Sequence, residues 1–209
     1  MEGLTGGHSG AEIHKGRANA NMTLGRVLQA AAKCSTLRIQ SVDGGLKDNA
    51  IPVASKACVV AADAAAVKAA AAEMETALKN EFRVTDPHLT VMVEDGCTDV
   101  VPMDASSTEK VICMLTCLPN GVQAMSAEIE GLVQTSLNMG ILATAEQEVR
   151  AGFCVRSSVD SQKEMLKARL ETLMGILGGS VTFAGDYTGW QYQENSPLRD
   201  LMVEVYREQ

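Results

Sequence analysis

The segment Gly6-Gly7-His8-Ser9-Gly10 is the densest group of residues that could do chemistry. Glycines let a backbone approach another surface closely, and the histidine stands at the expected start of a helix. Polar or small residues continue along one side of that helix at spacings of three and four: Gly10, His14, Arg17 and Asn21. Two interpretations stay open from these residues alone, a functional histidine or small packing residues beside a solvated polar face.

A complete catalytic site is not expected in this sequence. The only histidines are His8, His14 and His88, and no His-x-Asp, His-Glu-x-x-His or Cys/His cluster would hold a metal ion. No Gly-x-Ser-x-Gly elbow and no phosphate-binding Gly-rich loop occurs. Most acidic residues lie on predicted polar helix faces, where solvation is their usual role.

The six cysteines are expected to be reduced and buried. They stand at positions 34, 58, 97, 113, 117 and 154, with no Cys-x-x-Cys pair and no nearby histidine. Several lie in apolar stretches, where a free thiol behaves as a small hydrophobic side chain.

Composition excludes two classes of partner. The net charge is −8 and aromatic residues make up 3%, so neither a basic face for phosphates nor a base-stacking platform is expected, and nucleic acid is set aside. No apolar run could span a bilayer and the first residues do not resemble a signal peptide, so no membrane association is expected. A cytoplasmic location is the default expectation.

Two successive sets of elements must position any functional residue. The first set begins with a helix from about Gly10 to Lys33, with Ser9 and Glu12 spaced as a capping box. Hydrophobic periodicity then predicts strands over Leu37–Asp43 and about Ile51–Ala62, a helix over Ala64–Phe82 and a strand over Leu89–Glu94. Met1–Thr5 is interpreted as the end of the strand that opens this set.

The second set is expected to repeat the order. It comprises a strand over Lys110–Leu118, a helix marked by Met125, Ile129 and Leu132, a hairpin of Thr135–Thr144 with Glu148–Arg156, a helix over Ser161–Leu177 and a strand over Ser180–Tyr187. Met74–Leu78 resembles Leu170–Met174 at the same point of the second long helix, which supports a duplication.

The predicted fold is therefore α+β, with two tandem ferredoxin-like β-α-β-β-α-β units. The expected limits are 1–95 for the first unit, with its first strand truncated, 96–109 for a linker, and 110–188 for the second unit. Residues 189–209 include a helix start at Ser196-Pro197 and are expected to return to a domain outside this chain. Both ends are expected to belong to something larger.

Several motifs resemble the aminoacyl-histidine dipeptidase family, also called peptidase D or cytosol non-specific dipeptidase. They span nearly the whole chain in the family's order: Gly3–Gly10, Ile13-His14, Gly16–Asn21, Gly44–Pro52, Thr135–Gly140, Val155–Ser158 and Gly185–Trp190. Gly-Gly-His-Ser alone would indicate only the wider clan, with carnosinases, aminoacylases and succinyl-diaminopimelate desuccinylase. The whole series is much more specific.

The resemblance implies that the chain is the lid domain of a cytoplasmic di-zinc dipeptidase acting on Xaa-His and related dipeptides. Two zinc ions would lie in the parent's catalytic domain, and none of their ligands matches a position here, so this chain is expected to hold no cofactor and to hydrolyse nothing alone. The implied partners are a dipeptide substrate, the chain's own catalytic domain and a second copy in a homodimer.

Two residues match lid positions with a role in the family. His8 matches the histidine that stabilises the tetrahedral oxyanion, and Arg156 matches the arginine that clamps the substrate's terminal carboxylate. Asn49 and Asn138 lie in family-like motifs and are weaker substrate-binding candidates. Asn120-Gly121-Val122 is expected where the second unit would start its own Gly-Gly-His helix. Each half would then keep one working element, and the two units would form a pseudo-dimeric lid.

Two other functions compete with this interpretation. A free-standing ferredoxin-like module could bind a small molecule or mediate dimerisation, and the fold alone does not exclude it. A non-peptidase amidohydrolase of the same clan comes third. Metal-ligand motifs encoded on either side of this segment would favour the lid.

Overall fold

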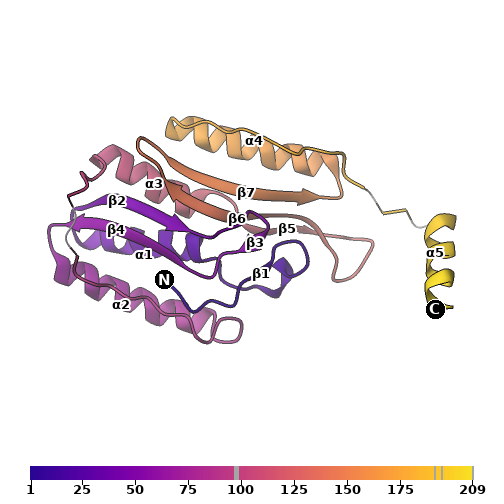
Figure 1. Cartoon of the computed structure of the whole chain (residues 1–209), viewed down its shortest axis with the longest axis horizontal. Coiled ribbons are helices and arrows are strands. Elements are labelled where there is room, and N and C mark those ends of the chain that lie inside the picture. Colours follow the sequence, from indigo (N-terminus) through magenta and orange to yellow (C-terminus); the bar gives the residue numbers. More distant parts are fainter. Residues whose placement is uncertain (97–98, 191, 194, 209) are drawn as a thin grey trace.

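The computed structural model describes residues 1–96, 99–190, 192–193 and 195–208. The larger antiparallel sheet has the strand order β4-β2-β6-β5, with β7 also paired to β6, and the helices α2, α1, α3 and α4 cover it in that order (Figure 1). The first half supplies α1 (Ala20–Cys34), β2 (Leu37–Gly44), β4 (Ser55–Ala61) and α2 (Ala64–Glu81). The second half supplies α3 (Ala105–Cys117), β6 (Val133–Thr144), β7 (Val149–Ser157) and α4 (Asp160–Leu177).

The two halves are joined at the middle of the sheet. Apart from the short strands β3 (Ala50–Ile51) and β5 (Gly121–Met125), each half has the order helix-strand-strand-helix, and β2 meets β6 antiparallel at the pair Gly44 and Leu142. α1 packs against both α2 and α3, which places the two inner helices beside each other. At the start of β4, the Ser55 N–H donates to the Met1 carbonyl (3.0 Å), and Glu2 pairs antiparallel with Thr90. This arrangement confirms the predicted α+β, ferredoxin-like fold.

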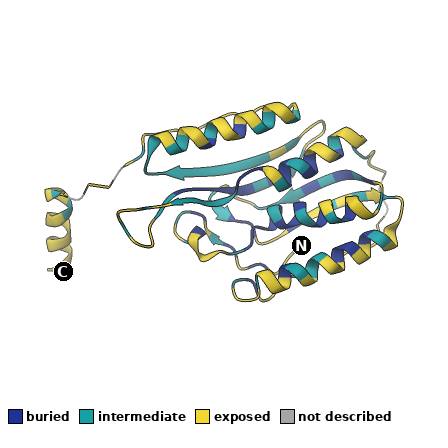
Figure 2. Ribbon diagram, turned by 180° about the vertical axis from the view of Figure 1, so that it is seen from behind, coloured by how far each residue is buried: buried dark blue, intermediate teal, exposed yellow. Residues whose placement is uncertain are grey.

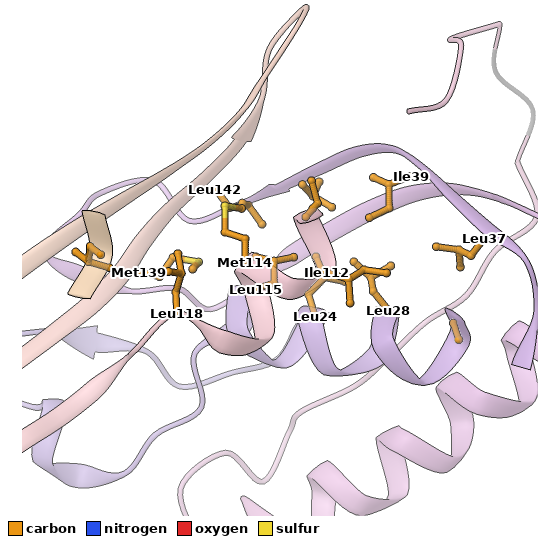
Figure 3. Close-up of a cluster of buried hydrophobic side chains, with 14 of the residues drawn as sticks. Leu24, Leu28, Leu37, Ile39, Ile112, Met114, Leu115, Leu118, Met139 and Leu142 are labelled. Carbon is orange, nitrogen blue, oxygen red and sulfur yellow. The ribbon is translucent and has the colours of Figure 1, made fainter. Parts of the chain in front are cut away.

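The core lies between the sheet and the inner helices, where both halves use the same spacing of apolar residues. β2 buries Leu37, Ile39 and Val42, and β6 buries Leu137, Met139 and Leu142 at the same spacing. Figure 3 shows Ile39, Met139 and Leu142 among the side chains of this core. A bulge follows Ile39 in β2 and Met139 in β6, and it turns the next apolar residue back toward the helices. Leu24 and Leu28 of α1 and Leu115 of α3 belong to the same cluster.

The first helix is shorter than its sequence predicts. A 3-10 turn covers Ile13–Lys15, Gly16 takes φ +66°, and α1 begins only at Ala20. Its cap is Asn19, whose side chain accepts from the N–H groups of residues 21 and 22, so the capping box proposed for Ser9 and Glu12 is wrong. The turn at Gly16 also breaks the predicted polar stripe, because Asn21 is buried in α1 while His14 is exposed.

Other boundaries of the first half also differ. The strand expected over Ile51–Ala62 divides into β3 (Ala50–Ile51) and β4, because Pro52 interrupts the ladder. The strand expected over Leu89–Glu94 is reduced to the single bridge between Glu2 and Thr90. β2 and α2 agree with the predicted ranges to within one residue.

Two predictions for the beginning of the second half are wrong. Lys110–Leu118 lies mostly in α3, not in a strand, because Asp104 caps a helix that buries Val111, Ile112 and Leu115 on one face. The region predicted as a helix from Met125 to Leu132 instead contains the end of β5 (Gly121–Met125) and turns. Asn120-Gly121-Val122 therefore follows the helix α3 and does not start one.

The end of the second half agrees better. The hairpin of β6 and β7 and the helix α4 are confirmed, whereas Ser180–Tyr187 forms no strand. Ser196 caps α5 (Pro197–Arg207) as expected, and no α5 residue is buried (Figure 2). The proposed limits of the two units and the linker remain predictions, and α3 begins inside the range given to the linker.

The cysteines differ from their predicted burial. Cys34, Cys58 and Cys117 are exposed, Cys113 and Cys154 are half-buried, and all five are free thiols. Cys97 lies outside the described residues. Within the described residues, no helix combines the length and apolar character that a membrane crossing requires.

A buried asparagine network links the two halves. The Asn138 side chain donates to the carbonyls of Asp48 (2.9 Å) and Ala50 (2.8 Å), and its Oδ1 accepts from Asn19 Nδ2 (3.1 Å). Asn19 Nδ2 also lies within 3.1 Å of the Met139 carbonyl. These contacts fix residues 48–50, which lead into β3, against β6 and the N-terminus of α1.

Asn138→Ala is expected to lower the free energy of unfolding by about 2–3 kcal/mol, because Asn19 Nδ2 and the part-buried carbonyls of Asp48 and Ala50 each lose a hydrogen-bond partner. Urea denaturation of the purified chain measures the change. Gln123→Ala is the matched control, since its amide reaches only nearby carbonyls at 3.3–3.4 Å, and it should cost less than about 0.5 kcal/mol. Equal midpoints for the two variants would contradict a structural role for the network.

Candidate functional site

His8 is held at the edge of a small two-stranded sheet. β1 (Gly7–His8) pairs antiparallel with β3, so that His8 lies opposite Ala50. The imidazole is exposed, and its Nδ1 accepts from the N–H groups of Gly10 (3.2 Å) and Ala11 (3.1 Å). A nitrogen that accepts two hydrogen bonds carries no proton, so the neutral ring has its N–H at Nε2. The ring therefore offers one unused donor.

Arg156 lies on β7, opposite Ser136 of β6. Its Nε is buried without a hydrogen-bond partner in the described part of the chain. The ion pairs of the described residues do not include Arg156, whereas Arg17, Arg26 and Arg150 each have a glutamate. Burying part of a guanidinium without a nearby anion costs free energy, and an acidic ligand bound to Arg156 would offset that cost.

Gly10 brings the two residues together. A Cβ atom built on Gly10 would lie 3.0 Å from His8 Cε1 and 3.2 Å from Arg156 Nε. The imidazole and the guanidinium thus flank one small residue, although one comes from each half of the chain. A hydrogen-bond donor and a cation in this arrangement could bind two oxygens of one small ligand.

The two asparagine candidates have structural contacts in this structure. Asn138 is buried within the network described above. Asn49 is half-buried, and its carbonyl accepts from the Ser9 N–H at 2.9 Å, which fixes the strand segment that carries His8. Both residues therefore help to fix the position of the loop that carries His8.

A cavity of about 420 Å³ beside β7 includes Arg156 in its lining. Lys163 and Lys167 of α4 also line it and both bind Asp186, at 2.7 Å each. The hydrogen bonds from these lysines, Lys163 first, lower the pKa of Asp186 to about 2. Sequence reasoning missed this cluster, because the segment that carries Asp186 was predicted as a regular strand.

A second cavity, of about 540 Å³, is not part of this site. It lies at the opposite edge of the sheet, beside β4 and α2, and neither His8 nor Arg156 lines it. Among the described residues, no group of three or more His, Cys, Asp and Glu side chains could hold a metal ion. The chemistry that these residues can supply is ligand binding and charge stabilisation.

Comparisons with known proteins agree over nearly the whole chain. The profile of the peptidase dimerisation domain family matches residues 1–86. The cytosol non-specific dipeptidase of Escherichia coli strain K12 is 36% identical over 209 residues, which are 99% of this chain and 43% of that protein. The crystal structure of aminoacylhistidine dipeptidase from Vibrio alginolyticus has a TM-score of 0.91 and 32% identity, and the match covers 99% of this chain and 43% of that one. The chain thus spans less than half the length of these relatives.

Proposed function

Because the chain belongs to the aminoacyl-histidine dipeptidase family as its peptidase dimerisation domain, we propose that it acts as the substrate-binding lid of a metallo-dipeptidase. The proposed substrates are Xaa-His and related dipeptides. The observation that carries the proposal is the meeting of His8 and the unpaired Arg156 at Gly10.

His8 would stabilise the oxyanion that forms when a nucleophile attacks the scissile carbonyl. Its Nδ1 is fixed by two backbone N–H groups, so Nε2–H is available to donate. A donor fixed before the reaction needs no reorganisation as negative charge develops, which is the basis of oxyanion stabilisation.

Arg156 would bind the terminal carboxylate of the dipeptide. Guanidinium is planar and presents paired N–H donors that match a carboxylate. Within the described residues no carboxylate competes for Arg156, so a substrate would supply the missing anion.

The two halves of one chain would serve one active site. His8 comes from the first half and Arg156 from the second, and the β2–β6 contact joins these halves as a symmetric dimer interface would. A catalytic domain or a second copy of the chain is the proposed protein partner. A cytosolic location, which the Escherichia coli relative has in its name, is proposed for this protein too.

Zinc would belong to the catalytic domain of a longer protein, where two ions would polarise the scissile carbonyl and lower the pKa of the attacking water. The purified 209-residue chain is expected to bind no stoichiometric zinc and to leave Xaa-His dipeptides intact, because zinc sites need three or four clustered ligands. Isothermal titration calorimetry with zinc chloride checks this. Tight binding together with chelator-sensitive hydrolysis would contradict the lid assignment.

Gly10→Ala tests the meeting of the two groups directly. In a protein that joins this chain to its catalytic domain, the new methyl group must push His8 or Arg156 aside, and kcat/KM is expected to fall about 10–10²-fold. Gly175→Ala is the matched control, because it lies in α4 with open space around its Cβ position. It should leave kcat/KM unchanged, and it should stabilise the helix by up to about 1 kcal/mol. If Gly10→Ala has normal kinetics, the two residues do not act together at this point.

A further inference from the structure

The carboxylate of Glu12 binds the backbone of His8 and two cations at once. Its Oε2 accepts from the His8 N–H at 3.0 Å, and its own N–H donates to the His8 carbonyl at 2.9 Å. Its Oε1 lies 2.8 Å from Lys15 Nζ and 3.1 Å from Arg17 NH1. Both backbone polar groups of His8 are therefore bound by the same residue.

Arg17 connects Glu12 to the glycines that precede His8. Its NH1 donates to the Gly6 carbonyl and also pairs with Glu12. Gly7 has φ +138°, and a Cβ there would fall against the Arg17 guanidinium and 2.6 Å from Glu12 Oε2. The loop around His8 thus has a glycine at the position closest to the Glu12–Arg17 pair, which explains why Gly7 directly precedes the histidine.

We propose that Glu12 is a positioning residue that, together with Arg17, fixes the backbone of His8 and thereby keeps its Nε2–H directed outward. The inference rests on the function proposed for His8. Glu12 would not touch substrate, since its carboxylate is already occupied by His8, Lys15 and Arg17.

The same contacts keep the Glu12 carboxylate ionised. The hydrogen bond from Lys15, followed by that from the His8 N–H, lowers the pKa of Glu12 to about 2, so the carboxylate is charged at neutral pH. Partly exposed ion pairs of this kind contribute little to global stability. A change at Glu12 should therefore alter the geometry of His8 much more than the folding of the chain.

The experiment is nitrogen-detected NMR of the purified chain with ¹⁵N-labelled histidine. In the wild type, the neutral His8 ring should carry its proton at Nε2. In Glu12→Ala, the ratio of Nδ1–H to Nε2–H tautomer should rise about tenfold, the factor that corresponds to the loss of roughly one hydrogen bond. Glu75→Ala is the matched control, because Glu75 also pairs with a lysine, Lys79 (2.7 Å), and accepts from a backbone N–H, that of Val91 (3.3 Å).

Identical His8 tautomer ratios in Glu12→Ala and Glu75→Ala would overturn the proposal. If Glu12→Ala does not fold, Glu12→Gln and Arg17→Met decide the matter, since both weaken the same contacts and keep the side-chain volume close to the original. At least one of them must shift the ratio for the proposal to stand. The readout needs no catalysis, so it can succeed even where His8→Ala leaves kcat unchanged and the proposed function fails.

A double-mutant cycle adds a kinetic test in a longer, active protein. If Glu12 acts only through His8, Glu12→Gln should lower kcat in the presence of His8 and should have little further effect in a His8→Ala background. Additive losses in kcat would show that Glu12 acts elsewhere, and they would overturn the positioning role.

Discussion

A His8→Ala variant of the active, longer protein is expected to lose about 10²–10³-fold in kcat, while KM changes little. This is the usual cost of removing one oxyanion donor, because the lost hydrogen bond strengthens only in the transition state. In the structure, His8 Nδ1 accepts from the Gly10 and Ala11 N–H groups, which leaves Nε2–H as the donor for the oxyanion. Steady-state kinetics with an Xaa-His dipeptide measures the two parameters.

The other two histidines provide the controls. His14 lies on the exposed 3-10 turn and His88 is exposed near the end of the first half, so neither change to alanine should alter kcat. Zinc content and melting temperature must match the wild type, since a destabilised lid would imitate lost catalysis. A His8→Ala enzyme with near-normal kcat would leave His8 as an exposed polar residue in a glycine-rich loop.

The long amphipathic elements could be predicted from the sequence, whereas the short ones could not. α2 and α4 have apolar residues at helical spacing and polar remainders, which determine a helix wherever it packs. Lys110–Leu118 was misassigned because its apolar run is short enough for either a strand or a buried helix. Asp104 as an N-cap is the signal that could have decided this in favour of α3.

The spacing of apolar residues in β2 and β6 is a clearer sign of the duplication than the similarity of Met74–Leu78 to Leu170–Met174. The apolar spacing of two and then three residues occurs in Leu37, Ile39 and Val42 and again in Leu137, Met139 and Leu142. A strict alternation would read the third residue of each set as facing solvent, and only the bulge makes it a core residue. Strand patterns with one extra residue are therefore easily overlooked in a single sequence.

His8 and Arg156 could be named from family resemblance, but their meeting at Gly10 could not. The distance between them depends on the β1–β3 pairing, the Asn138 network and the β2–β6 junction, which are all long-range contacts. Glu12 was predicted as half of a capping box, and the expected reach back to a backbone N–H does occur. The N–H belongs to His8 instead of Ser9, because the helix begins ten residues later than expected, at Ala20.

Arg156→Met in the active, longer protein is expected to raise KM about 10–10²-fold with a smaller effect on kcat. The substrate carboxylate is charged in the ground state and in the transition state. Removing the guanidinium therefore weakens binding of the substrate in both states about equally. The range corresponds to the loss of hydrogen bonds to a charged group, roughly 1.5–3 kcal/mol. Initial rates over a wide range of dipeptide concentration measure the change.

Arg150→Met is the matched control for this variant. Arg150 lies on the same strand, β7, but its side chain is 71% exposed and pairs with Glu148, so its removal should leave KM unchanged. Arg156→Lys should restore little of the lost affinity, because a single ammonium group cannot reproduce the paired donors of guanidinium. A dipeptide amide, which lacks the terminal carboxylate, should bind wild-type and Arg156→Met enzymes equally. If Arg156→Met weakens binding of the amide as strongly as binding of the free dipeptide, Arg156 does not bind the carboxylate. Its buried Nε, which has no hydrogen-bond partner among the described residues, would then need another explanation.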